Sequence, residues 1–423
     1  MPDTAPPSAS RYLVVGCGLG LLGELDKILS AGSVTVVDET DLLDAGDLRT
    51  KAMTHPCVAE VIDGPAQRHD GLLPLPADAL AGTVAVIPSW EYTVVTAAAC
   101  AEAAGVPGAG LKAARTLRDK VRLREAGAAA GLPQPRFAEV AGVADIRAFA
   151  AAHDGDLVLK PADRQAGVGV RLLAPGDDPA AAWERTRAAD DAKLRSAGFT
   201  PGRFLVEERL HGPEISAEVL VADGEVRWLN VTDKSVWPGP FPVEAGHTLP
   251  SPRTAALWDR VAEANRALVE AVGFRTGVLH SEWILADGTD PHLVECAGRL
   301  PGDAIVPLID LAYGGSLVED FVRVLRGEHP DRPARAARAA AVRFVSAAPG
   351  RVRTVRGADE AGAADAVFAA AATVAEGALV GELTSSWDRV GHVLTVADDA
   401  PSAEAAAVAA ASLITVETEP VTE

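Results

Sequence analysis

The chain has 423 residues, of which 48% are hydrophobic and 23% are charged, a balance that is typical of a globular protein and excludes a largely disordered chain. The length predicts roughly two to four domains. The formal net charge of -20 argues against nucleic acid and anionic membranes as partners, because a phosphate backbone is bound by a basic surface.

The first ten residues are polar and lack the basic region of a signal peptide, and the first apolar run, residues 12–15, stops at Gly16. No stretch reaches the ~18 uninterrupted apolar residues of a membrane-spanning helix. The four cysteines are widely spaced without a CxxC pair, which favours reduced thiols over a zinc site or a disulfide framework. These features lead us to expect a cytoplasmic protein.

The first part of the chain alternates strand and helix patterns. Strand patterns occupy residues 12–15, 34–38 and 83–87, and the helical pattern after the third strand ends at Gly105, which suits a left-handed cap. Residues 1–110 are therefore predicted to form a Rossmann-like parallel α/β domain.

A GxGxxG motif, Gly18-Leu-Gly20-Leu-Leu-Gly23, follows the first strand, and Asp38 lies about 20 residues further on. This pattern fits a dinucleotide-binding turn and so raises the alternative of an NAD-dependent oxidoreductase. The other interpretation is that the glycines only permit a tight turn and close helix packing. Tight NADH binding, without any effect of ATP on thermal stability, would favour the oxidoreductase.

The middle of the chain is predicted to be α+β with antiparallel strands. Residues 111–131 have a helical, basic pattern, and Pro133-Gln-Pro135 then enforces an extended connection. An Asp287-Gly288 turn indicates a hairpin. Strand patterns occupy residues 157–160, 168–173, 204–208, 215–221, 226–232, 277–285 and 292–295.

The last part of the chain is predicted to be a third unit. Residues 331–333 and the alanine- and arginine-rich stretch after them resemble a linker, and the unit starts near Ala341. The alanine-rich run 403–411 is predicted to be a helix, because alanine has the highest helix propensity.

Two glutamates on the predicted hairpin are candidate metal ligands. Alternation along residues 277–285 places His280 and Glu282 on one face, and a tight turn brings Glu295 beside or diagonal to Glu282. Adjacent half-buried carboxylates repel each other unless a cation lies between them, and Mg²⁺ commonly takes one or two carboxylates plus substrate phosphates. Without further context, two such glutamates are more often surface residues.

Cationic residues near this hairpin add weight to the metal hypothesis. Arg299 lies four residues beyond Glu295 in a loop bounded by glycine and proline, where its guanidinium could bind a phosphoryl group or a carboxylate. Lys160 ends a strand and precedes a loop containing Gly167 and Gly169 that could close over phosphates.

These features, taken in order, resemble the ATP-grasp family and specifically its L-amino-acid ligase (carboxylate-amine ligase) branch. The motifs that carry the resemblance are Trp90-Glu-Tyr, Arg118-Asp119-Lys120, Leu157-Val-Leu-Lys160-Pro, Val206-Glu-Glu-Arg-Leu-His-Gly-Pro-Glu214, Gly277-Val-Leu-His280-Ser-Glu282, and Glu295 with Arg299. The segments Pro242-Val-Glu244-Ala-Gly-His247, Val342-Arg-Phe-Val-Ser and Asp388-Arg-Val-Gly391-His392 are similar to the ligase branch.

The resemblance implies three parts: an N-terminal domain (1–110), an ATP-grasp domain (111–328) with a mobile lid at about 131–206, and a C-terminal α+β domain (329–423). The cofactors would be ATP and Mg²⁺, with Mn²⁺ as a possible substitute. The implied ATP-binding residues are Lys120, Lys160, Gly167 and Gly169 at the phosphates, Glu207, Glu208 and Leu210 at the adenine, and Glu214 at the ribose.

The resemblance also implies metal and substrate residues. Glu282 and Glu295 would bind magnesium, and Arg299, with Lys160, would be catalytic by stabilising an acyl phosphate. The implied substrate residues are Glu244, His247, His280, Arg299, Gly302 and Asp303. The implied substrates are a small carboxylate and a small amine, with amino acids as the expected class, and the implied assembly to test is a homodimer.

Two positions depart from the family pattern. Many ATP-grasp enzymes have asparagine two positions beyond the second metal glutamate, where this chain has Ala297, so phosphate or water oxygens would complete the magnesium shell. The phosphate loop has Ala166-Gly167 in place of a common serine, which leaves contacts through backbone N–H groups.

The resemblance implies an ATP-dependent ligase that forms an amide bond through an acyl phosphate and releases ADP and phosphate. An ATP-grasp carboxylase, a purine-pathway ligase and a non-catalytic nucleotide-binding scaffold are the alternatives on the same fold. Asp303 could select a basic substrate, although its position favours the other interpretation, a surface-exposed aspartate at a loop end.

Overall fold

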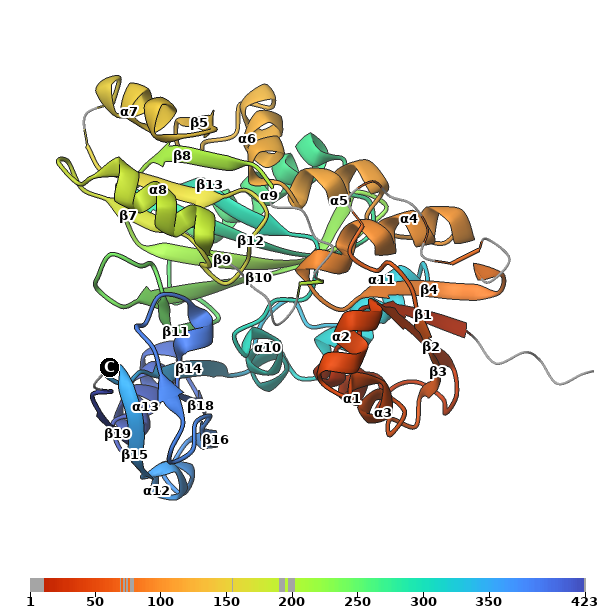
Figure 1. The fold of residues 1–423 in the computed structure, drawn as a ribbon. Helices are drawn as coiled ribbons and strands as arrows, with labels where there is room; N and C mark the ends of the chain where they lie inside the picture. The colour runs from red at the N-terminus through yellow and green to blue at the C-terminus, as the bar shows by residue number, and fades with distance from the viewer. Residues whose placement is uncertain are drawn as a thin grey trace, which may run out of the picture.

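The computed structural model describes residues 11–68, 70, 73, 75–76, 80–153, 155–189, 195–196 and 202–421. Figure 1 shows an N-terminal α/β unit, a central sheet with a smaller sheet above it, and a C-terminal unit beside the central sheet. The polar start of the chain and parts of the expected lid, at 190–194 and 197–201, lie outside the described residues.

The N-terminal unit is a parallel sheet with helices, as the sequence predicts. Its strands are ordered β3-β2-β1-β4, and side chains on the two faces of β1 enter two different apolar cores. The helix α4 ends at Gly105 with φ of 70°, the predicted left-handed cap. The elements are β1 (Arg11–Val15), α1 (Leu19–Leu25), β2 (Val34–Asp38), α2 (Thr40–Ala45), α3 (Leu48–Ala52), β3 (Val58–Asp63), β4 (Thr83–Pro88), the 3-10 helix η2 (Glu91–Thr93) and α4 (Val94–Ala104).

Asp38, the acidic residue of the glycine motif, stabilises the turn itself. Its fully buried carboxylate accepts hydrogen bonds from the backbone N–H groups of Cys17 at 2.8 Å and Glu39 at 2.9 Å. A Cβ added at Gly16 would lie 2.9 Å from Thr93, so this glycine permits close packing against η2. The geometry favours the packing interpretation of the motif, because the carboxylate is not available to a ribose.

A measurable pH dependence follows from this arrangement. Burial raises the pKa of Asp38 to about 6, so between about pH 4 and 6 the folded chain binds a proton that the unfolded chain has released. Stability should therefore fall as pH rises through that window, by up to about 3 kcal/mol for this group. Urea unfolding at several pH values should show a shallower decline for Asp38→Asn than for the wild type; parallel declines would contradict the assignment.

Two helices lead out of the N-terminal unit over the residues that have the predicted helical pattern. They are α5 (Leu111–Leu117) and α6 (Lys120–Ala129), so the helical segment is interrupted at residues 118–119. The physical reason is Asp119, whose carboxylate accepts hydrogen bonds from the N–H groups of Val121 and Arg122 and so starts a new helix. As a result Lys120 occupies the first turn of α6.

A small antiparallel sheet with two helices forms the unit that we call the lid. The strand order is β5-β8-β6-β7, and α8 packs on β6. Its elements are β5 (Phe137–Val140), α7 (Val143–Ala151), β6 (Leu157–Pro161), β7 (Arg171–Leu173), α8 (Pro179–Ala188) and β8 (Phe204–Glu208). Lys160 lies near the end of β6, as predicted.

The central sheet has eight strands in the order β13-β12-β9-β10-β11-β14-β18-β16. Asp287 and Gly288 have positive φ angles of 51° and 79°, which confirms the predicted hairpin turn between β12 and β13. The helix α9 packs on β9, β10 and β13. The elements up to residue 325 are β9 (Glu214–Ala222), β10 (Glu225–Val236), β11 (Glu244–Leu249), α9 (Ala255–Val272), β12 (Gly277–Ala286), β13 (Asp290–Ala297), α10 (Ile305–Tyr313) and α11 (Leu317–Leu325).

Two features of this sheet differ from the sequence expectation. The strand β10 continues four residues past the predicted end at Thr232, to Val236. The segment with Glu244 and His247, expected to be a substrate loop, is the strand β11, which pairs with β10 on one side and β14 on the other. Hydrogen bonds to strands on both sides satisfy the backbone N–H and C=O groups of β11, although this segment contains a glycine and is flanked by prolines.

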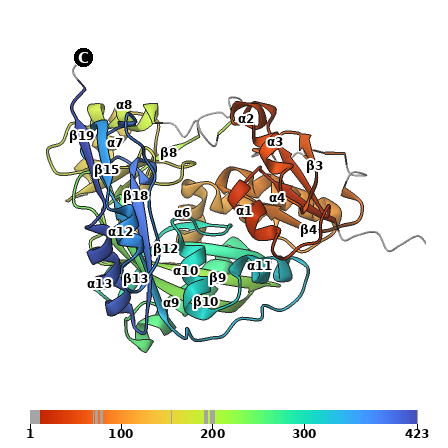
Figure 2. The same ribbon diagram turned by 90° about the horizontal axis from the view of Figure 1, so that it is seen from below.

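The C-terminal unit extends the central sheet and adds a second one. Figure 2 shows its strands and α13 gathered on one side of the molecule, away from the N-terminal unit. The predicted helix at 403–411 is confirmed as α13, which packs on β14 and β18. The elements are β14 (Ala339–Val345), β15 (Gly350–Arg356), α12 (Ala358–Gly362), β16 (Val367–Ala372), β17 (Leu379–Val380), the 3-10 helix η3 (Ser386–Asp388), β18 (Gly391–Ala397), α13 (Ala400–Ala411) and β19 (Thr415–Glu419).

A three-stranded sheet, ordered β17-β15-β19, completes the C-terminal unit. Among the residues that the structure describes, none of the helices is both long and apolar enough to cross a membrane.

Candidate active site

A cavity of about 1150 Å³ lies where the units meet, and each unit contributes to its wall. Fourteen of the predicted site residues line it: Lys160, Gly167, Glu207, Glu208, Leu210, Glu214, Glu244, His247, His280, Glu282, Glu295, Arg299, Gly302 and Asp303. The other two predicted residues, Lys120 and Gly169, are not among the residues that line the cavity. Lys120 reaches Glu295, and a Cβ at Gly169 would lie 2.9 Å from Pro161 at the end of β6.

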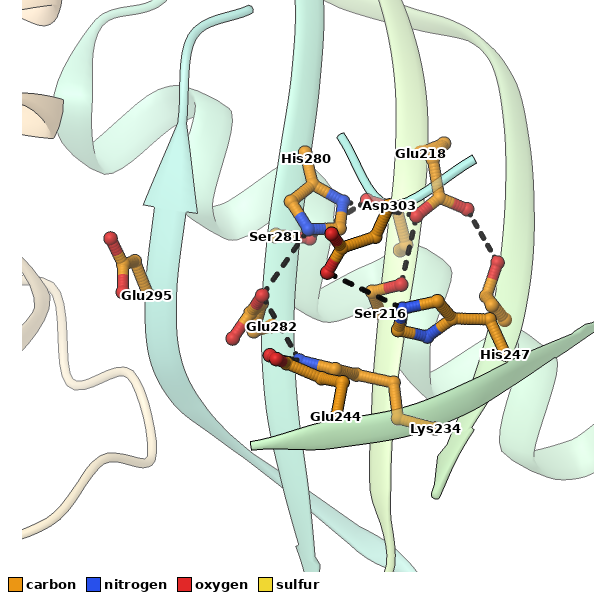
Figure 3. A network of polar contacts seen from close by, with 12 residues as sticks. Ser216, Glu218, Lys234, Glu244, His247, His280, Ser281, Glu282, Glu295 and Asp303 are labelled. Carbon is orange, nitrogen blue, oxygen red and sulfur yellow. Dashed lines mark hydrogen bonds and ion pairs between the residues drawn. The ribbon is translucent and has the colours of Figure 1, made fainter. Parts of the chain in front are cut away.

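The two candidate metal ligands occupy paired positions on the hairpin. Glu282 on β12 pairs directly with Glu295 on β13, which confirms the predicted neighbourhood of the two residues (Figure 3). Each carboxylate also has a lysine partner, Lys234 at 3.0 Å from Glu282 and Lys120 at 2.8 Å from Glu295. The lysines offset the repulsion that two adjacent carboxylates would otherwise have.

Lys234, a residue that the sequence interpretation missed, is a buried cation at the centre of the site. Its ammonium lies 3.0 Å from Glu282 and 3.4 Å from Glu244 (Figure 3). Burial lowers the pKa of Lys234, but Glu282, Glu244 and Glu214 outweigh that effect and raise it above its usual range. Lys234 therefore carries a positive charge deep in the cavity.

His280 is held between two carboxylates. Its Nδ1 lies 3.1 Å from Glu218 and its Nε2 lies 3.2 Å from Glu282 (Figure 3). Burial lowers the pKa of His280, whereas the hydrogen bonds to both carboxylates raise it, to about 9 in total. At neutral pH the ring is therefore an imidazolium whose two N–H groups donate to Glu218 and Glu282, and it orients Glu282. The substrate contact expected of His280 stays a prediction.

Glu218 is anchored by three polar neighbours on the sheet. Its buried carboxylate accepts hydrogen bonds from Ser216 at 2.8 Å, Asn230 at 2.7 Å and Thr232 at 2.8 Å. Burial raises the pKa of Glu218, but the bond from His280 and these donors lower it overall. A fully bonded network of this kind fixes the position of His280.

The lid contributes a lysine that is paired at the hinge. Lys160 Nζ lies 2.7 Å from Glu207, and Arg124 Nε donates to the same carboxylate at 2.6 Å. Burial lowers the pKa of Lys160, and Glu207 opposes the change. The expected role of Glu207 at the adenine stays a prediction, because its carboxylate is occupied by two cations, although it lines the cavity with Glu208 and Leu210.

Arg299 connects the metal-ligand hairpin with the N-terminal unit. Its Nε donates to the buried Glu91 of η2 at 2.9 Å, and its Nη1 donates to the carbonyl of Leu300 at 2.9 Å. This ion pair leaves one terminal nitrogen of the planar fork, Nη2, for an anionic group in the cavity. Glu91 is a second residue of the site that the sequence interpretation did not single out.

A loop of the C-terminal unit closes the β11 side of the cavity. Ser386 of η3 donates a hydrogen bond of 2.8 Å to Glu244, and its N–H donates to the carbonyl of Ala166 in the phosphate loop at 3.2 Å. His247 lies with Nε2 3.6 Å from Asp303, and among the described residues neither buried ring nitrogen has a hydrogen-bond partner. An unsatisfied buried imidazole in a cavity wall is suited to a polar ligand.

Asp303 borders the cavity, but its carboxylate is paired with Arg389, which stacks 3.7 Å from the Phe344 ring. Burial raises the pKa of Asp303, while His247 and Arg389 lower it well below its usual range. A basic substrate would have to compete with Arg389. We therefore expect Asp303→Asn to leave the ranking of arginine, lysine and neutral amino acids in ADP release unchanged; selective loss with the basic ones would restore the selection hypothesis.

The donor set fits magnesium bound together with phosphates. No group of three or more His, Cys, Asp or Glu side chains in the described part of the chain is placed to hold a metal ion. Two facing carboxylates are what Mg²⁺ commonly takes from a protein when phosphate and water oxygens complete its octahedron. Ala297, at the end of β13, offers no side-chain oxygen to change that number.

A signal for the missed residues exists in the sequence. Asn230, Thr232 and Lys234 recur at every second position of β10, so they share one face of the strand, while the apolar Leu229 and Val231 lie on the other face. Polar residues at that spacing on a buried strand indicate a site. Glu91 and Arg389 lie within two of the quoted motifs, Trp90-Glu-Tyr and Asp388-Arg-Val-Gly391-His392, but nothing in the motifs shows that the two side chains reach the cavity, and Ser386 had no sequence signal.

Comparisons with known proteins agree with this geometry. Residues 154–307 match the model of the ATP-grasp domain, and residues 343–419 match that of L-amino acid ligase C-terminal domain 2. Alanine–anticapsin ligase of Bacillus subtilis (strain 168) is 29% identical over 268 residues, which are 60% of this chain and 56% of that relative. The chain thus spans little more than half the length of the curated relative that it matches.

Two solved structures share the fold over nearly the whole chain. The L-amino acid ligase from Bacillus licheniformis has a TM-score of 0.75 at 17% identity, covering 98% of this chain and 100% of that one. Phosphoribosylglycinamide synthetase from Anaerococcus prevotii has a TM-score of 0.68 at 14% identity, covering 97% and 100%. The chain therefore has the ATP-grasp fold, contains an ATP-grasp domain at residues 154–307, and matches the C-terminal domain 2 of L-amino acid ligases at residues 343–419.

Proposed function

We propose that this protein is an ATP-dependent ligase that joins the carboxylate of one amino acid to the amine of another through an acyl phosphate. The observation that carries the proposal is that one cavity is lined by Glu282 and Glu295, at paired strand positions, together with Lys160, Lys234 and Arg299. Two acidic ligands for a metal ion, surrounded by cations for phosphates, suit phosphoryl transfer from a nucleotide.

The hinge end of the cavity suits the nucleotide. Leu210 and Glu208 would border the adenine, and Glu214, whose pKa burial raises, would lie near the ribose. Glu282 and Glu295 would hold Mg²⁺, whose charge would offset that of the phosphates. The lysines that neutralise the glutamates in the free protein, Lys120 and Lys234, are then close enough to turn to phosphate oxygens.

The first chemical step is in-line attack of a substrate carboxylate oxygen on the γ-phosphoryl group, with ADP as the leaving group. Lys160, Lys234 and Arg299 supply fixed positive charge where negative charge develops, which is the main protein contribution to such a reaction. The contact of Ser386 with Ala166 joins the lid loop to the C-terminal unit above this centre.

The second step is attack of the amine nitrogen on the acyl carbon, which expels phosphate and forms the amide after loss of a proton. Water would compete with the amine, so the lid and the C-terminal loop must exclude it. The name of the curated relative, an alanine ligase, supports amino acids as the substrates.

A phosphate-release screen tests the proposal. Full-length protein with Mg-ATP is incubated with pairs of L-amino acids, and products are identified by mass. Phosphate release that needs both amino acids, with a dipeptide mass, is the expected result. Release with bicarbonate or phosphoribosylamine instead would point to a carboxylase or a purine-pathway ligase, and ATP binding without any turnover would point to a scaffold.

A further inference from the structure

The cavity extends past Arg299 to the helix α1, beyond the parts proposed above for the nucleotide and for the acyl donor beside β11. We propose that this extension, which we call the α1 lobe, binds the apolar side chain of the amine-donating amino acid. The proposal rests on the proposed ligase function and adds to it the chemical class of the second substrate. The glycine motif of the N-terminal unit thereby gains a ligand-binding role that involves no dinucleotide.

The wall of the α1 lobe is apolar. Leu21 of α1, Trp90 before η2, and Val306 and Leu311 of α10 all line the cavity and are only partly buried against the core beneath them. Figures 1 and 2 both place α10 beside the N-terminal unit, in agreement with the shared cavity that these residues line. Partly exposed apolar side chains in a concave site gain most when a ligand covers them.

Gly20 leaves the lobe open. It lies in α1 and lines the cavity, and a Cβ built on it would have no heavy atom within 4 Å. The other glycines of the motif differ, since a Cβ at Gly18 would lie 3.2 Å from Ser89 and one at Gly23 would lie 3.8 Å from His55. Gly20 is exposed at the edge of the cavity, so the absence of a side chain there keeps the mouth of the lobe open and is not required by packing.

The charges at the rim of the lobe are already compensated. Lys27 lies 2.7 Å from Glu24, and Asp310 lies 3.0 Å from Arg332 while it also accepts a hydrogen bond from Leu317. Because these ionic groups are paired, a charged side chain in the lobe would have to compete with Glu24–Lys27 or Asp310–Arg332 for a counterion. This favours an apolar side chain as its occupant.

The position of Arg299 assigns the lobe to the amine. Glu282, Glu295 and Arg299 mark where the acyl phosphate forms, and the nucleotide occupies the hinge side of that point. Glu244 and His247 provide polar groups for the acyl donor on the β11 side. The α1 lobe is the remaining approach to the reacting carbon, so the attacking amine would come from there.

Enlarging residue 20 tests the lobe directly. Gly20 has no positive φ angle and lies in a helix, so leucine is compatible with its backbone. We expect Gly20→Leu to raise the KM for L-phenylalanine or L-leucine as amine donor by about tenfold or more, with the KM values for glycine and for ATP within about twofold of wild type. Gly20→Ala should have an intermediate effect. Gly23→Ala, on the same helix outside the cavity, is the matched control.

Steady-state ADP release, with the donor order read from fragment masses of the dipeptide, separates the outcomes. An unchanged amine KM in Gly20→Leu, or a raised KM for the acyl donor instead, overturns the assignment while the ligase function stands. Leu311→Ala gives an independent check: it should weaken binding of the same bulky amine, and unchanged binding would count against the lobe. Absence of amino-acid-dependent ADP release in the wild type would overturn the function and the lobe together.

Discussion

Replacing either Glu282 or Glu295 by glutamine should reduce amine-dependent ADP release by more than about 100-fold. The expectation follows from their position. They occupy paired positions on β12 and β13 and line the cavity, and we propose them as the two carboxylate ligands of a magnesium ion bound with phosphates. Even residues that only orient metal ligands typically change metal affinity or activity by about 10- to 100-fold, so direct ligands should exceed that.

A magnesium titration distinguishes loss of the metal from loss of the fold. The concentration of Mg²⁺ that gives half-maximal activity should rise in each variant, while thermal unfolding in EDTA shows that the protein is still folded. Glu225→Gln is the matched control, since Glu225 begins β10, is exposed and lies outside the cavity wall. Turnover like that of the wild type in either Gln variant would remove the metal assignment.

The sequence predicts the hairpin and the acidic pair well because both depend on local pattern. Period-two alternation and the Asp287-Gly288 turn bring the two glutamates onto adjacent strands. A β-bulge between Glu282 and Trp283, which the sequence does not predict, shifts the register by one residue and places Glu282 opposite Glu295. The helix α13 and the cap at Gly105 are equally local, and both are found where the sequence indicates them.

The parts that the sequence does not predict depend on contacts between distant segments. The strand β11 becomes a strand because β10 and β14 pair with it, and β14 is about 100 residues away. Arg299 reaches Glu91 across 208 positions of sequence, and Arg389 reaches Asp303 across 86. No sequence periodicity encodes such partners. Only the structure shows that Asp303 pairs with Arg389 and that Glu207 pairs with Arg124 and Lys160.

Replacement of Lys234 by methionine should lower both stability and activity, because the lysine side chain is only 2% exposed and compensates several acidic groups. Removing one partner of a buried ion pair costs about 3 to 5 kcal/mol, since the other charge is left in a poorly hydrated position. Here Glu282 and Glu244 would both lose their shared cation. Urea unfolding in EDTA measures this loss, and Lys112→Met, at an exposed position on α5, is the control.

A double variant separates the structural role of Lys234 from a role toward phosphate. If the stability loss comes from an uncompensated Glu244, adding Glu244→Gln to Lys234→Met should recover part of it, which a double-mutant cycle reports as coupling. Activity should not recover, because the positive charge beside the transferring phosphoryl group is still missing. A Lys234→Met variant with wild-type stability and wild-type ADP release would show that neither role exists. Recovery of activity along with stability would show that Lys234 acts only by holding the carboxylates in place.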